Sequence, residues 1–137
     1  MMDKGQLAGT LGQGEAAERK LYTTFLASAF RTLHFGLTSS HARGMAIQVN
    51  YLLDKGGFVA HGDGVFSVDF KKIKQAVLDL DREFLTIEAT GDYARAKDMM
   101  AKYVVIRPEV QQALDKMKAV PNDIRPAFST AKALLKK

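Results

Sequence analysis

The sequence contains no cysteine, and this absence removes several kinds of chemistry at once. Disulfide bonds, thiolate metal sites and a cysteine nucleophile are all excluded. No apolar run approaches the roughly 20 residues that a membrane-spanning helix needs. The first residues also lack the basic and then apolar build of a signal peptide. We therefore expect a cytoplasmic protein that does not interact with membranes.

Known catalytic motifs are missing as well. The three histidines, His34, His41 and His61, are seven and twenty residues apart, so no two of them lie one helical turn apart. The sequence has no HExxH motif, no Gly-x-Ser-x-Gly elbow and no glycine-rich loop that ends in GK[ST]. From the residues alone we predict neither a metal site nor a catalytic centre in this chain.

Charges of both signs are present, but basic residues dominate one half of the chain. Residues 1–69 hold six Lys and Arg against six Asp and Glu, whereas residues 70–137 hold fourteen against nine. The excess is spread through interleaved pairs, which is typical of a solvated surface. The alternative is an anionic partner, an acidic peptide or a nucleic acid. Nucleic acid is less favoured, because proteins that bind it usually gather positive charge on one face.

Length and composition fit one folded domain with a short leading arm. A chain of 137 residues, 47% of them hydrophobic, can bury roughly two-thirds of its unfolded surface. Glycine and short polar residues dominate residues 1–14, which we predict to be a flexible N-terminal arm. Residues 15–137 show no internal repeat and no clear linker, so we expect a single helical domain there.

Hydrophobic periodicity predicts helices along most of this domain. A first helix is expected over residues 15–35, and a second follows a cap at Thr38, Ser39 or Ser40. The sequence GFVAHGDGVFSVDF then places apolar residues on both sides of a turn at residues 61–64, which predicts a β-hairpin. The expected fold class is mainly α: a helical array or bundle with one short β-hairpin.

The most regular helical pattern begins at Asp69, the expected cap of a helix that Gly91 ends. Its apolar side chains recur every three or four positions, and we expect them to be largely buried: Phe70, Ile73, Val77, Leu80 and Phe84. Asp92 then starts a shorter helix that continues to about Tyr103.

Proline marks the last predicted elements. Pro108 fits the first turn of a further helix. Residues 121–126, with a proline at each end, are predicted to form a restrained loop, and residues 127–137 a final helix.

The second predicted helix opens with an unusual combination of side chains. His41, Arg43 and Gly44 lie in its first turns, and glycine costs up to ~1 kcal/mol relative to alanine inside a helix. Gly44 either allows close helix packing or leaves room for a ligand backbone to approach. His41 either shields the helix start or presents its imidazole to a ligand. The residues alone leave both alternatives open.

A longer stretch of the sequence bears on the roles of His41 and Gly44. The sequence FRTLHFGLTSSHARGMAIQVNYLLDKGGF, followed by the hairpin and by VDFKKIKQAVLDLDREFLTIEATGDYARAKDMMAKY, resembles the C-terminal part of the dipeptidyl-peptidase III family of zinc metallopeptidases. The resemblance covers roughly residues 15–107 and rests on the order of several segments. It implies a helical portion of a hydrolase that removes dipeptides from the N-termini of peptides.

The zinc-binding motifs of that family do not occur in this sequence. Members hold zinc through an HExxGH-type helix and a nearby glutamate-bearing helix, and both are absent here. The resemblance therefore implies a substrate-cleft portion that is inactive alone and holds no cofactor itself, with zinc bound by another portion of the same polypeptide. Some bacterial members also carry an N-terminal Nudix module, but this sequence has no Nudix box.

The resemblance also implies roles for individual residues. His41 matches a family histidine that faces the zinc site and hydrogen-bonds to the substrate or the transition state, a role open to an imidazole that does not bind the metal. Gly44 would keep the cleft wall low, and Asn50 on the same helix is a further candidate for substrate binding. Arg125 is the best match for a family arginine that contacts the peptide. Arg43 has no secure counterpart.

Overall fold

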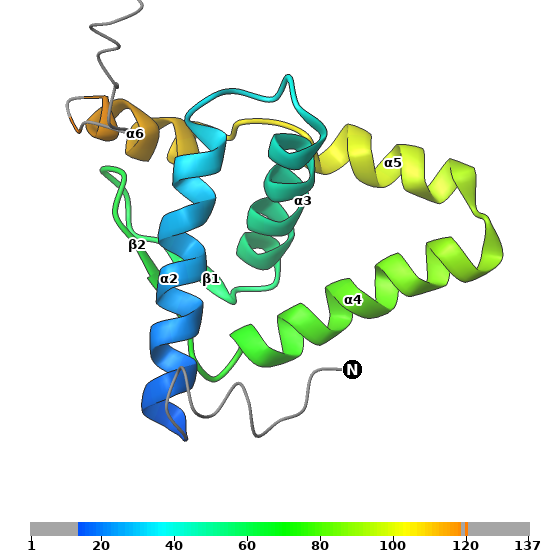
Figure 1. The fold of residues 1–137 in the computed structure, drawn as a ribbon, viewed down its shortest axis with the longest axis horizontal. Helices are drawn as coiled ribbons and strands as arrows, with labels where there is room; N and C mark the ends of the chain where they lie inside the picture. Colours follow the sequence, from blue (N-terminus) through cyan, green and yellow to red (C-terminus); the bar gives the residue numbers. More distant parts are fainter. Residues whose placement is uncertain (1–13, 119, 121–137) are drawn as a thin grey trace, which may run out of the picture.

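The computed structural model describes residues 14–118 and residue 120. Within this range the chain forms a mainly α-helical domain with one β-hairpin, as the sequence predicted (Figure 1). The elements, in chain order, are α2 (Glu15–Leu33), α3 (Ser40–Asp54), β1 (Phe58–Ala60), β2 (Phe66–Val68), α4 (Ile73–Thr90), α5 (Tyr93–Tyr103) and α6 (Pro108–Met117). No helix of the described part is long and apolar enough to cross a membrane.

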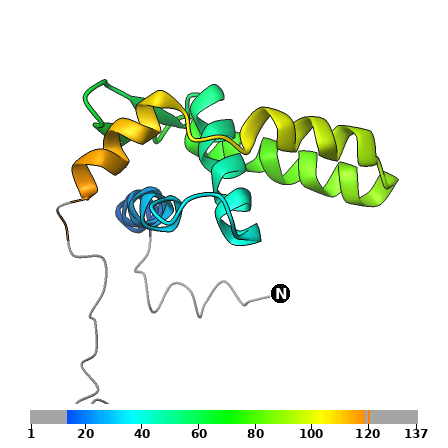
Figure 2. The ribbon, with the colours of Figure 1, turned by 90° about the horizontal axis from the view of Figure 1, so that it is seen from above.

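Helix α3 is the central element of the domain. It packs against α2, α4, α5 and β1, and Figure 1 shows it between α2 and α4. Helices α4 and α5 meet at the turn formed by residues 91–92 and run in opposite directions. Figure 1 shows them diverging from this turn, and Figure 2 shows both extending away from the remaining elements. Helix α6 contacts α2 on the opposite side of the domain.

Two groups of buried side chains hold these elements together. The larger group joins α2, α3, β1, α4 and α6, and consists of Leu26, Ala29, Phe30, Leu33, Ala46, Val49, Leu52, Phe58, Ile73, Ala76, Val110, Ala113 and Leu114. The smaller group joins α3, α4 and α5, and consists of Ile47, Tyr51, Leu80, Met99 and Tyr103. Because α3 contributes to both groups, its position is fixed from two sides.

The local signals in the sequence explain most helix ends. The Ser39 side chain accepts a hydrogen bond from the Ala42 backbone N–H at 3.1 Å, so Ser39 is the cap of α3. Gly91 ends α4 in the left-handed conformation, and the side chain of Asp92 caps α5 through the N–H of Arg95. Pro108 occupies the first turn of α6, where its missing N–H costs no hydrogen bond.

The start of α4 differs from the prediction. Asp69 does not cap this helix, because its side chain accepts from the N–H of Lys71 within a separate turn. Its backbone carbonyl accepts from the N–H groups of Lys72 and Ile73, and α4 begins only at Ile73. The prediction identified Asp69 as a turn residue but placed the helix start three residues too early.

The predicted burial of α4 is correct at two positions and wrong at one. Ile73 and Leu80 are buried, whereas Phe70 and Val77 are half-buried. Phe84 is 37% exposed, contrary to the prediction. Its ring lies at a groove between α2 and α4 that no described element covers.

The hairpin lies where the sequence predicted it. Strands β1 and β2 are antiparallel, with Phe58 opposite Val68. The turn contains Gly62, Asp63 and Gly64, all with positive φ. Gly64 lies against α6, and a Cβ added there would be 2.9 Å from the backbone of Ala113.

Three predictions concern residues outside the described part of the chain. They are the flexible arm at residues 1–14, of which the structure describes only residue 14, the loop at residues 121–126 and the final helix at residues 127–137.

Candidate functional site

The candidate site lies at the N-terminal end of α3. The Ser39 cap fixes the first turn, and Ala42 is buried beneath it. His41 lies between these two residues, and its side chain is exposed. The helix start is therefore held by Ser39 and Ala42, which leaves the His41 imidazole available for contacts outside the described residues.

Gly44 and Gln48 continue the same face of α3. Residues three and four positions apart lie above one another on a helix, so His41, Gly44 and Gln48 form a row. A Cβ added at Gly44 would meet no heavy atom of the described residues within 4 Å beyond its own helix and neighbours. The Gln48 amide donates to the Gly44 carbonyl at 3.3 Å. Gly44 thus faces open space and does not serve close helix packing in this part of the chain.

Arg43 lies apart from this row. Its side chain is exposed, and its guanidinium donates to the Thr38 carbonyl at 3.5 Å, a long hydrogen bond in the loop that precedes α3. Arg125 lies outside the described residues, so the structure does not place it relative to His41.

Asn50, which the sequence analysis named as a candidate for substrate binding, lies inside the protein. Its side chain is 1% exposed, and its amide nitrogen donates to the carbonyls of Tyr103 at 2.8 Å and Val105 at 2.9 Å. The amide oxygen, Oδ1, is buried and accepts no hydrogen bond from the described residues. In this structure Asn50 holds the α5–α6 connection against α3, and its side chain does not face solvent.

Asp54, one turn after Asn50, forms ion pairs with residues at the two ends of the α5–α6 connection. Its carboxylate lies 2.7 Å from the Arg107 guanidinium and 3.5 Å from the Lys102 ammonium. The hydrogen bond from Arg107 lowers the pKa of Asp54, and the positive charges of both partners act in the same direction. The sequence offered no signal for this pair, because 53 residues separate the partners.

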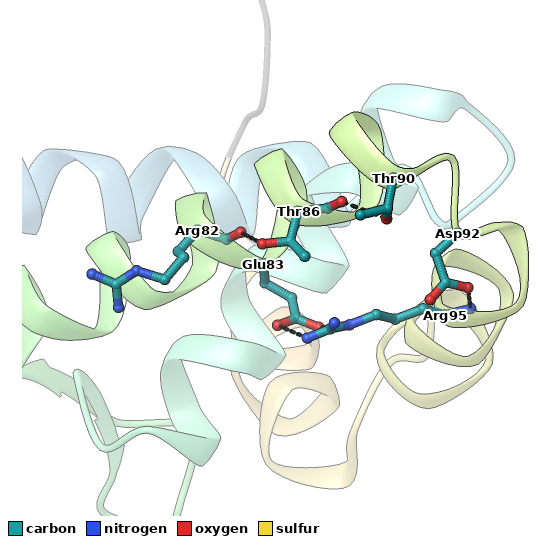
Figure 3. Close-up of polar contacts among 6 residues, drawn as sticks. All are labelled: Arg82, Glu83, Thr86, Thr90, Asp92 and Arg95. Carbon is teal, nitrogen blue, oxygen red and sulfur yellow. Dashed lines mark hydrogen bonds and ion pairs between the residues drawn. The ribbon is translucent and has the colours of Figure 1, made fainter.

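A second ion pair joins α4 to α5 (Figure 3). Arg95 donates two hydrogen bonds to the Glu83 carboxylate, at 2.6 and 2.7 Å, and these bonds raise the pKa of Arg95. The pair borders a pocket of about 450 Å³ whose other lining residues include Tyr51 and Asp54. Because the charged groups at this pocket are largely neutralised by one another, they support the packing of α5 rather than a catalytic role.

The other histidines have structural surroundings. The His61 Nε2 lies 2.6 Å from the Ser67 hydroxyl across the hairpin. The His34 ring packs edge-on against Phe35 at the end of α2. Within residues 14–118 no three His, Asp or Glu side chains are arranged to hold a metal ion. The described residues therefore do not fit a zinc site.

Comparisons with known proteins bear on the identity of this fold. No family model matches the chain. Dipeptidyl-peptidase III from Corallococcus sp. strain EGB superimposes with a TM-score of 0.77 and 40% identity over 96% of this chain. The enzyme of the same name from Caldithrix abyssi gives a TM-score of 0.80 and 35% identity over 94% of the chain. The resemblance to dipeptidyl-peptidase III is confirmed.

The matches extend over only part of the related proteins. The chain spans 25% of the length of each dipeptidyl-peptidase III structure. It is also 46% identical over 117 residues to Nudix hydrolase 3 from Arabidopsis thaliana, a match that covers 84% of this chain and 15% of that protein. With so small a share matched, the name of the plant protein assigns no Nudix activity to this chain.

Proposed function

We propose that this chain forms the helical substrate-cleft portion of a zinc-dependent dipeptidyl peptidase, which removes dipeptides from peptide N-termini in the cytoplasm. The observation that carries the proposal is the match to two dipeptidyl-peptidase III structures over nearly the whole chain, at 35% and 40% identity. Since the described residues hold no metal site, the proposal places zinc in another portion of the polypeptide and expects this chain alone to be inactive.

His41 is the residue proposed to act on the substrate. Its exposed imidazole can donate a hydrogen bond to the oxygen of the scissile carbonyl as negative charge develops there. A bond that strengthens as the charge develops accelerates the reaction, because it favours the transition state over the bound substrate.

Gly44 is proposed to let the peptide backbone approach the helix. The space above it is open among the described residues, and the neighbouring Gln48 side chain is bonded back to the helix. Arg125 remains a candidate for contact with the peptide. Asn50 is assigned a different role: its buried amide fixes the connection between α5 and α6, and so positions α3.

The alternative function, a separate module that binds an acidic peptide or a nucleic acid, receives less support. It relied on the basic excess of residues 70–137. Of the ten Lys and Arg side chains at positions 70–118 of the described chain, eight lie within 4 Å of a carboxylate, and the exceptions are Lys71 and Lys97. Neutralised cations attract an anionic partner weakly, so we retain the peptidase as the proposed function.

The test uses a chimera in which the 137-residue chain replaces the matching quarter of the Corallococcus enzyme. We expect the chimera to release dipeptides from a chromogenic dipeptidyl amide. His41→Ala should lower turnover by roughly 10²–10³-fold, the effect of removing one oxyanion donor, with zinc content and melting temperature unchanged. His61→Ala is the matched control, because that exposed histidine lies on the hairpin, and it should leave turnover unchanged. Normal turnover of a fully metallated His41→Ala chimera would refute the role of His41.

A further inference from the structure

An apolar groove lies between α2 and α4, with α3 as its floor. Its volume is about 270 Å³. Its walls are formed by Leu21, Tyr22 and Phe25 of α2, by Gln48 and Leu52 of α3, and by Val77, Leu80, Asp81 and Phe84 of α4. Figure 1 shows the cause: α2 and α4 both pack on α3 but point in different directions, so they diverge.

Two large apolar side chains at this groove remain accessible. Leu21 is 48% exposed and Phe84 is 37% exposed, although both belong to helix faces whose other members pack inward. The sequence pattern predicted burial for Phe84, and within the described residues nothing provides it. Exposed apolar side chains that line a concave surface are typical of a docking site.

Asp81 adds a charge to this apolar surface. Its side chain is exposed and lines the groove, and it forms no ion pair with any described residue, whereas Asp79 on the same helix pairs with Arg82. An apolar groove beside an unpaired carboxylate favours a segment that combines an apolar side chain with a lysine or arginine.

The length of the related chains indicates where such a segment comes from. This chain superimposes almost completely on dipeptidyl-peptidase III structures, yet it spans only 25% of their length. A quarter of a larger folded chain must bury part of its surface against the other three quarters. The apolar groove is the surface of this domain best suited to that contact.

We propose that the groove between α2 and α4 is a docking site for the remaining polypeptide of a dipeptidyl-peptidase III enzyme, which inserts an apolar side chain at Leu21 and Phe84 and pairs a lysine or arginine with Asp81. This inference rests on the proposed function for the identity of the partner. Gln48 lines the groove and also belongs to the row of α3 residues that includes His41 and Gly44, so docking there would also fix the helix that presents His41.

The test compares groove variants in two settings, the 137-residue chain alone and the chimera with the Corallococcus enzyme. Phe84→Ser and Leu21→Ser should lower the thermal midpoint of the chimera clearly further than that of the isolated chain. Asp81→Lys should act in the same direction. The matched controls are Leu85→Ser, since Leu85 is 64% exposed on α4 outside the groove, and Asp98→Lys. Equal effects of groove and control variants on the chimera would overturn the proposal.

Other occupants give different results. If a second copy fills the groove, the isolated chain dimerises and Phe84→Ser makes it monomeric. If residues 1–13 fill it, their removal lowers the midpoint of the isolated chain, and Phe84→Ser has no further effect. Either result overturns the proposal. An inactive chimera that still shows the groove effect would refute the proposed function while leaving the docking site supported.

A second measurement applies if the chimera does not fold. The isolated chain is tested for binding to overlapping synthetic peptides that cover the other three quarters of the Corallococcus enzyme. At least one peptide with adjacent apolar and basic residues should bind the wild-type chain at least ~10-fold more tightly than the Phe84→Ser variant, a difference of about 1.4 kcal/mol. If no peptide distinguishes the two, the groove is not the docking site.

Discussion

The carboxylate of Asp54 and the guanidinium of Arg107 meet at 2.7 Å, although 53 residues separate them in the sequence. One turn earlier on α3, Asn50 binds the carbonyls of Tyr103 and Val105. A single helix face thus holds the whole connection between α5 and α6. Since the other end of the same helix carries His41, the geometry of the candidate site depends on these contacts.

The Asp54–Arg107 pair predicts a dependence of stability on pH. Because Arg107 lowers the pKa of Asp54 in the folded protein, the pair stabilises the fold above the unfolded-state pKa of about 3.9. This stabilisation is lost as the pH falls through the lower pKa of the folded state. Asp54→Asn should therefore lower the free energy of unfolding by about 1 kcal/mol at pH 7, and by progressively less below pH ~4.

Thermal melts of wild type and Asp54→Asn between pH 2 and pH 7 measure this difference. Asp98→Asn is the control, because Asp98 forms no ion pair with any described residue. A gap between wild type and Asp54→Asn that persists undiminished at pH 2 would contradict the electrostatic explanation.

Asn50→Ala should be strongly destabilising. It removes two buried hydrogen bonds and leaves the carbonyls of Tyr103 and Val105 with one partner fewer, so we expect a loss of about 2–3 kcal/mol in urea unfolding. Asn50→Asp should cost more at pH 7, since a carboxylate would face two carbonyl oxygens, and should recover stability as acid protonates it. Gln48→Ala, half-buried on the same helix, serves as the control. Equal urea midpoints for Asn50→Ala and Gln48→Ala would show that the connection does not depend on this amide.

The two turn glycines of the hairpin should respond differently to alanine. Both have positive φ, +83° at Gly62 and +67° at Gly64, which costs ~1–2 kcal/mol for a residue with a Cβ. A Cβ at Gly62 meets no described atom within 4 Å, whereas at Gly64 it would be 2.9 Å from Ala113 of α6. Gly64→Ala should therefore destabilise by a further ~1–3 kcal/mol. Equal melting temperatures for the two variants would mean that α6 moves away at no cost.

Phe84→Ala and Ile73→Ala test how α4 is buried. Ile73 is 1% exposed in the main core, so its truncation should cost ~2–5 kcal/mol. Phe84 is 37% exposed, so the same change there should cost only about 1–2 kcal/mol in this chain, below the ~3–5 kcal/mol of an enclosed ring. Chemical denaturation measures the free energy of unfolding of both variants. A larger loss for Phe84→Ala than for Ile73→Ala would indicate that the Phe84 ring lies inside the core.

The sequence predicted those features that depend on neighbours along the chain. The cap at Asp92, the stop at Gly91 and the proline start of α6 were predicted because each requires a particular residue type at a particular backbone position, and the cap of α3 was narrowed to three residues, of which Ser39 is the one used. The hairpin followed from glycines at positions that need positive φ. The resemblance to dipeptidyl-peptidase III rested on the order of these same local segments.

The features that the sequence did not predict depend on contacts between distant segments. Asn50 is a polar residue, and only the carbonyls of Tyr103 and Val105, more than 50 residues away, make its burial favourable. Phe84 follows a regular apolar pattern, but that pattern indicates only which face points inward and not whether another helix covers it. His41 could be assigned a role only through resemblance, since an exposed histidine at a helix start carries no signal of its own.

The attachment of α3 to residues 103–107 also bears on how the domain is made. During translation α2, α3 and the hairpin leave the ribosome well before the residues that bind Asn50 and Asp54. Until then the Asn50 amide lacks the carbonyls of Tyr103 and Val105, and α3 lacks the contacts with α5 that hold one of its two packed sides. A nascent chain that stops before Arg107 is therefore an incomplete domain, whatever helices it has already formed, and its long-range closure is one of the last steps of folding.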